Sequence, residues 1–144
     1  MRDGPGTILV GVDGSTSSLR AAAYALGLAR RQGSRLVAVY VRTPPSALLP
    51  LADTGGAAAT VVDTQDALEQ ELRTAFTERL RDVDVDARLL VRAGEPYTEL
   101  CDAAREVRAD AVIVGRSANL LHRVAGSIGN KLVRCGRWPV TVVP

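Results

Sequence analysis

Short apolar segments alternate with amphipathic segments along the whole chain, and this alternation constrains the fold more than any other feature. The apolar segments have the length of strands, and most are continuous runs of Val, Ile, Leu and Ala, as in strands buried on both faces of a sheet. The segments between them are long enough to cross over from one parallel strand to the next. Strands are therefore expected at residues 7–12, 36–41, 85–91, 110–114 and 140–143.

Helices are expected in the connections between these strands. Thr16 or Ser17 can cap the first helix, and Pro96 suits the first position of the third. Residues 43–60 contain three prolines and no clear periodicity, so they predict a long mobile connection. The first helix is expected to follow its cap at Thr16 or Ser17 and to stop at Gln32-Gly33-Ser34. The other helices are expected at about 63–82, at 96–107 and from 127 to about 135.

The order of these elements predicts one α/β domain with a doubly wound parallel sheet, because crossovers between parallel strands are right-handed. Apolar residues make up 47% of the chain and aromatic residues only 3%, so the core must be aliphatic, which suits such a sheet. Apolar and polar residues alternate within 85–91, which indicates a half-exposed strand near an edge.

Charge and cysteine usage exclude several classes of function. A net charge of +2, with acids and bases interleaved, gives no electrostatic footprint for nucleic acid. Cys101 and Cys135 have neither metal-ligand nor redox-motif spacing, and we interpret them as small buried residues in a reducing cytosol. No apolar stretch reaches the roughly 20 residues that span a bilayer. A cytoplasmic protein is expected.

The segment from Gly115 to Ser127 is the strongest functional feature. A buried strand ends at Gly115, and Gly126-Ser127 stands where the next helix begins. The free N–H groups and the dipole at a helix N-terminus attract phosphate. The segment therefore predicts an anion site, although Ser127 could equally be a plain helix cap.

These motifs, in this order, resemble those of the universal stress protein family over residues 7–144. The first strand and turn read Val10-Gly11-Val12-Asp13-Gly14-Ser15, and the chain closes on Trp138-Pro139-Val140-Thr141-Val142-Val143. The resemblance implies one three-layer domain over 7–144, after a flexible segment 1–6. It also implies a five-stranded parallel sheet of order 3-2-1-4-5 with a cleft between strands one and four.

Nucleotide-binding members of that family carry a signature of glycine, two residues, glycine, nine residues, then glycine and Ser or Thr. Gly115, Gly126 and Ser127 match it. Ala118 replaces the second glycine, and only residues 119–125 separate it from Gly126. The loop is thus two residues shorter than the signature, and the methyl group of Ala118 limits the approach of a phosphate.

The resemblance implies a cytoplasmic stress-response regulator rather than an enzyme, with ATP or another adenine nucleotide, with or without Mg²⁺, as a ligand. No catalytic or metal-ligating residue is expected. Arg123 could also pair with a phosphate, or it could equally be a solvated loop arginine. His122 could face a phosphate, but solvent exposure is the favoured interpretation. The implied nucleotide-site residues are Val12, Asp13, Val41, Gly115, Arg116, Ser117, Gly126, Ser127 and Ile128.

Several of these residues have plain structural alternatives. Asp13 could form an Asx turn with Gly14 and Ser15, since aspartate side chains often bond the backbone two residues on. Val41 could be a core valine, and Arg116 a solvated arginine.

The family resemblance also implies a homodimer through the last strand, Val140 to Val143, which would cover an apolar sheet edge. Trp138 could pack in that interface, which is the favoured interpretation, or under the last helix.

Two other functions stay open. One is a nucleotide-free interaction module that meets its partners through residues 43–60. The other is a slow ATPase or phosphotransferase that uses Asp13, Ser127 and Mg²⁺.

Overall fold

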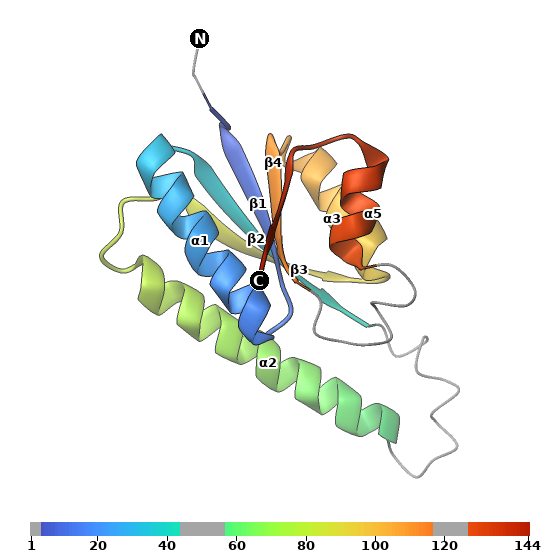
Figure 1. Cartoon of the computed structure of the whole chain (residues 1–144). Helices are drawn as coiled ribbons and strands as arrows, with labels where there is room; N and C mark the ends of the chain where they lie inside the picture. The colour runs from blue at the N-terminus through green and yellow to red at the C-terminus, as the bar shows by residue number, and fades with distance from the viewer. Residues whose placement is uncertain (1–3, 44–56, 117–126) are drawn as a thin grey trace.

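Five parallel strands form one sheet of order β3-β2-β1-β4-β5, which confirms the predicted order. The structure is a computed structural model, and it describes residues 4–43, 57–116 and 127–144. The strand order reverses between β1, the central strand, and its neighbour β4 (Figure 1). The strands are β1 (Thr7–Val12), β2 (Arg35–Arg42), β3 (Ala87–Ala93), β4 (Ala111–Gly115) and β5 (Val140–Val143).

In the described part of the chain, two helices cover each face of the sheet, so the three-layer prediction is also confirmed (Figure 1). Helices α1 (Thr16–Gln32) and α2 (Ala57–Leu80) cover one face, and α3 (Pro96–Glu106) and α5 (Ile128–Cys135) cover the other. Alternate residues of a strand serve opposite faces. In β1, Ile8 packs toward α1 and Leu9 toward α3.

The starts of the first two helices differ from the sequence prediction. Ser15, rather than Thr16 or Ser17, caps α1, and its hydroxyl accepts a hydrogen bond from the backbone N–H of Ser18 at 3.2 Å. Helix α2 begins at Ala57, well before the expected residue 63. The end of the expected connection 43–60 is therefore helical, and residues 44–56 lie outside the described part of the chain.

The two edge strands have the exposure that the sequence indicated. Among the described strands β3 pairs with β2 alone, and its side chains are mostly half-buried. β5 pairs with β4, and Val142 on it is 46% exposed. Trp138 packs against the apolar cluster that α3 and α5 share, which supports its alternative place beneath the last helix.

The start of the described chain is held to the sheet. The backbone N–H groups of Gly6 and Thr7 both donate to the Asp110 carboxylate, and the Ser34 hydroxyl donates to the Pro5 carbonyl. Pro5 and Gly6 belong to the segment expected to be flexible. No described helix combines the length and the apolar character needed to cross a membrane.

Candidate functional site

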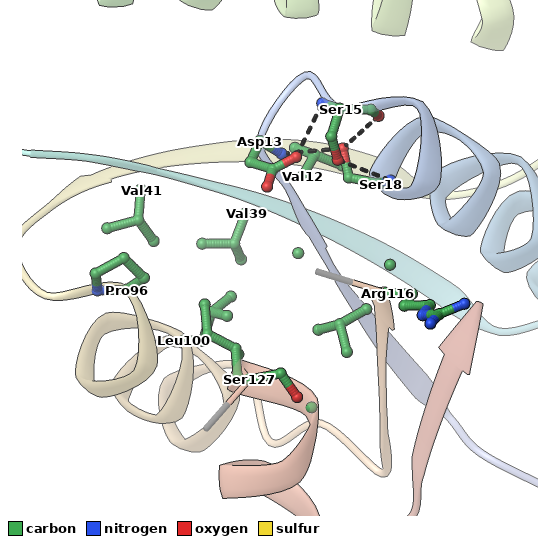
Figure 2. A pocket seen from close by; sticks show the side chains of 15 residues that line it. Val12, Asp13, Ser15, Ser18, Val39, Val41, Pro96, Leu100, Arg116 and Ser127 are labelled. Atoms are coloured by element: carbon green, nitrogen blue, oxygen red, sulfur yellow. Dashed lines mark hydrogen bonds between the residues drawn. The ribbon is translucent and has the colours of Figure 1, made fainter. Parts of the chain in front are cut away.

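A cavity of about 180 Å³ lies at the carboxyl ends of β1, β2 and β4 (Figure 2). This is the place where the strand order reverses, and open α/β sheets bind their ligands there. The start of each of α1, α3 and α5 contributes residues to the lining. The cavity therefore combines strand ends with three helix N-termini.

One side of the cavity is an apolar wall. Val39 and Val41 come from β2, and Pro96 and Leu100 come from the first turns of α3 (Figure 2). Val39 and Leu100 are buried in the core, so the wall is backed by close packing. Such a wall suits a flat apolar ring rather than a charged group.

Asp13 follows β1 at the opposite side of the cavity (Figure 2). Its Oδ1 accepts a hydrogen bond from the backbone N–H of Ser15 at 2.9 Å, so the expected Asx turn is present. Partial desolvation of the carboxyl favours its neutral form, but hydrogen bonds with Ser15 and Ser18 outweigh this and lower the pKa of Asp13. Asp13 is therefore an ionised acceptor at the cavity.

Ser127 caps α5 beside the cavity (Figure 2). Its hydroxyl accepts a hydrogen bond from the backbone N–H of Asn130 at 3.2 Å, and its backbone is extended, as at an ordinary N-cap. Ile128 and Gly129 also line the cavity, and the first turn of α5 has no acidic side chain. The positive end of this helix can therefore face an anion.

Gly115 ends β4 in close contact with the start of α1. A Cβ atom on Gly115 would lie 2.5 Å from the backbone C of Ser17 and the backbone N of Ser18. Glycine is thus required here for packing, independently of any ligand. The next residue is fixed by its backbone: the Arg116 N–H donates to the Val143 carbonyl at 2.7 Å, and the Arg116 carbonyl accepts from the Ser17 hydroxyl at 2.6 Å.

The structure brings most of the predicted site residues to one cavity. Ser117 and Gly126 lie outside the described residues, as do Ala118, His122 and Arg123. The predicted residues that line the cavity are Val12, Asp13, Val41, Gly115, Arg116, Ser127 and Ile128.

Other lining residues were missed by the sequence interpretation. Ser15 and Ser18 are recognisable as a helix start two and five residues after Asp13. Val39, Pro96 and Leu100 carry no such signal, because they are ordinary core or turn residues until the sheet order is known.

An open parallel sheet with a cavity at its switch point places this chain in the class of Rossmann-like α/β domains. Residues 5–144 match the model of the universal stress protein family. The chain belongs to this family, as its sequence motifs indicated.

Solved structures of family members have the same fold. A universal stress protein from Burkholderia pseudomallei is 28% identical, with a TM-score of 0.74 and 96% of each chain covered. A universal stress protein in complex with cAMP is 26% identical, with a TM-score of 0.70, and 99% of this chain and 98% of that one are covered. UspA from Lactobacillus plantarum is 24% identical, with a TM-score of 0.76, and the alignment covers 96% of this chain and 97% of that one. No curated protein matches the chain significantly.

Proposed function

We propose that this universal stress protein is a cytoplasmic stress-response regulator that binds an adenine nucleotide, ATP or a close relative, as a ligand in the switch-point cavity. The observation that carries the proposal is the arrangement of three kinds of group around one cavity. An apolar wall, an ionised carboxylate and a helix N-terminus match the base, the ribose and the phosphates of a nucleotide.

Each part of the nucleotide has a partner in this arrangement. The adenine ring would lie against Val41 and Leu100, because these side chains form the apolar wall. Asp13 would accept hydrogen bonds from ribose hydroxyls, since an ionised carboxylate only accepts. The phosphates would face the start of α5 at Ser127, with the Arg116 guanidinium as a charged partner.

Two relatives support this ligand class. One is the universal stress protein described as a complex with cAMP, at 26% identity. Another is a family member from Arabidopsis thaliana described with AMP bound, at 18% identity, whose likeness concerns the fold.

The cavity also fits the use of Mg²⁺ with a polyphosphate. Mg²⁺ is usually held by one or two carboxylates together with phosphate oxygens. Asp13 is the one carboxylate among the described lining residues, so it would hold the ion if ATP arrives with Mg²⁺.

The nucleotide acts in this proposal as a ligand and not as a substrate. Asp13 and Arg116 are the titratable side chains among the described lining residues. An efficient general base has a pKa near the working pH, whereas that of Asp13 is lowered. Hydrolysis above background that disappears in Asp13→Ala would support a slow ATPase instead.

Two substitutions of one residue test the phosphate position. Asp and Asn cap helices as well as Ser does, so both Ser127→Asp and Ser127→Asn should preserve α5. Only the aspartate adds a negative charge where the phosphates are expected. Binding of Mg-ATP, AMP and cAMP, measured by calorimetry, should be lost in Ser127→Asp and retained in Ser127→Asn. Equal nucleotide binding by the two variants would show that the phosphates do not lie at the start of α5.

One observation favours a nucleotide-free interaction module as the second candidate. The described residues enclose about 180 Å³, whereas ligand cavities usually span about 300–1,000 Å³. If no adenine nucleotide binds the unmodified protein at millimolar concentration, this candidate replaces the first.

We also propose that two copies of the chain pair through β5. The described β5 has no partner strand on its outer side, and Val142 is half-exposed there. Val133, on the adjoining helix α5, is 58% exposed. An apolar edge strand has unpaired backbone N–H and C=O groups that can bond another strand. A two-fold dimer would cover this edge.

A further inference from the structure

The two cysteines, far apart in the sequence, lie on neighbouring helices. Cys101 is on α3 and Cys135 is on α5, and both are free thiols. The helices pack side by side on one face of the sheet (Figure 1). Cys101 is only 4% exposed, whereas Cys135 is half-buried. Spacing along the chain gave no sign of this arrangement.

The register between the two helices places the two cysteines at the same height along the helix axes. Each helix leads from one parallel strand to the next on the same face, so α3 and α5 run in the same direction. The Lys131 ammonium lies 5.9 Å from the centroid of the Tyr97 ring, which places these two residues opposite each other. Cys101 and Cys135 come four residues later on their respective helices, about one turn in each case.

The electrostatics of Tyr97 agree with this placement. The Cys101 thiol first, then desolvation and the Cys135 thiol, raise the pKa of Tyr97 to about 12, so both thiols belong to the surroundings of this one side chain. The Cys135 thiol donates to the Leu132 carbonyl of the preceding turn at 3.0 Å, and the Leu132 side chain is buried in the same apolar cluster as Cys101.

We propose that Cys101 and Cys135 are a redox pair that a peroxide converts into an intrachain disulfide joining α3 to α5. This inference does not depend on nucleotide binding.

The reaction with peroxide balances in two steps. The Cys135 thiolate attacks one peroxide oxygen, so an S–O bond forms, the O–O bond breaks, and the departing hydroxide takes up the released thiol proton as water. The sulfur of Cys101 then attacks the sulfenic sulfur of Cys135. The S–S bond forms as the S–O bond breaks, and the oxygen leaves as a second water with the Cys101 proton. The two sulfurs lose two electrons in total, and these reduce the peroxide.

The assignment of the two roles follows from burial. Cys135 is the more accessible thiol, so it meets the oxidant first. Cys101 is buried, and burial raises the pKa of its thiol, which keeps it protonated until the sulfenic acid forms beside it.

A bridge here would tie together two helices that reach the switch-point cavity. Leu100, next to Cys101, lines the cavity, and so does Ile128 at the start of α5. The disulfide would therefore fix the distance between two helices whose first turns form part of the lining.

The test is oxidation of the purified full chain with hydrogen peroxide, followed by mass spectrometry of the intact protein and its peptides. The expected product is a monomer lighter by two hydrogen atoms, with the peptides of Cys101 and Cys135 linked, and dithiothreitol should reverse it. Retention of both thiols, stable addition of oxygen without a link, or linkage only between chains would overturn the proposal.

Single variants separate the two roles. Cys101→Ala should stop at a sulfenic acid on Cys135 that dimedone traps, and Cys135→Ser should resist the same dose of peroxide. Because Cys101 is buried, thermal unfolding checks that its variant is folded. Cys135 is half-buried, so Cys135→Ser tests the roles of the two thiols without changing a fully buried residue. Oxidation of Cys101 in Cys135→Ser as fast as in the unmodified chain would refute the assignment of roles.

Discussion

Gly115 ends β4 at a point where the chain passes against the first turn of α1. A Cβ atom there would meet the backbone of Ser17 and Ser18 at 2.5 Å, which is far inside contact distance, and backbone atoms cannot rotate away. The signature glycine of the family loop therefore has a packing reason in this chain. Gly115→Ala should lower the free energy of unfolding by about 3 kcal/mol, the upper part of the usual range for overpacking. Urea denaturation measures this.

The matched control for that prediction is Gly27→Ala. Gly27 lies inside α1, and a Cβ atom on it would meet only the flexible end of the Arg31 side chain at 3.2 Å. Alanine is the better helix former, so this variant should be more stable by about 0.5–1 kcal/mol. Equal destabilisation by the two substitutions would show that the contact with α1 is not the cause at Gly115.

Asp13 makes stability depend on pH in a known direction. Its folded pKa is lower than the ordinary value of 3.8, so the folded state favours the carboxylate. The resulting stabilisation is complete at neutral pH and is lost as the pH falls through 3.8 toward the folded pKa. Asp13→Asn keeps an acceptor for the Ser15 N–H but has no charge to titrate. It should be less stable than the unmodified chain at pH 7 by about 1 kcal/mol or less, because Asp13 is exposed.

Chemical denaturation at several pH values checks this prediction. The difference between the two proteins should shrink steadily below pH 3.8. A difference that stays constant down to strongly acidic pH would mean that the charge of Asp13 does not stabilise the fold.

Among the secondary-structure elements, α3 begins with an uncommon cap. The Glu95 carboxylate accepts hydrogen bonds from the backbone N–H of Tyr97 at 3.1 Å and of Thr98 at 2.8 Å. Glu95→Ala leaves both donors without this partner and should cost about 0.5–2 kcal/mol, the usual loss for a helix cap. Glu95→Asp should preserve stability, because aspartate is among the preferred caps. Thermal unfolding of both variants measures the contrast, and a loss in Glu95→Asp as large as in Glu95→Ala would contradict the capping role.

The elements were predictable from sequence where the pattern is strong and local. β1 and β4 are continuous apolar runs that read as strands without any tertiary information. The start of α1 was misplaced because 15, 16 and 17 are all Ser or Thr, and only the Asx turn of Asp13 selects Ser15. The start of α2 was misplaced because residues 57–62 follow a segment rich in Gly and Pro and end in three β-branched residues, which are weak helix formers.

For the molecule as a whole, the resemblance to a known family supplied what local patterns could not. The resemblance implied both the order of the strands and the position of the cleft. The observed sheet has that strand order, which confirms this prediction. The contact between Gly115 and Ser17 and the packing of α3, which carries Cys101, beside α5, which carries Cys135, join residues distant in sequence. No spacing rule reports such contacts, because they depend on how complete helices pack on the finished sheet.

The edge strand β5 allows a test of assembly. If two copies pair through β5, a lysine at position 142 would lose water and face the same charge of the partner copy. On a monomer, the same lysine could extend into water from this half-exposed site. Val142→Lys should therefore shift the protein from dimer to monomer in analytical ultracentrifugation with little loss of stability. The control is Ala93→Lys, which adds the same charge to an exposed position on β3 at the opposite edge and should leave the dimer intact. A dimer that survives Val142→Lys, or an unmodified chain that is monomeric at high micromolar concentration, would exclude pairing through β5.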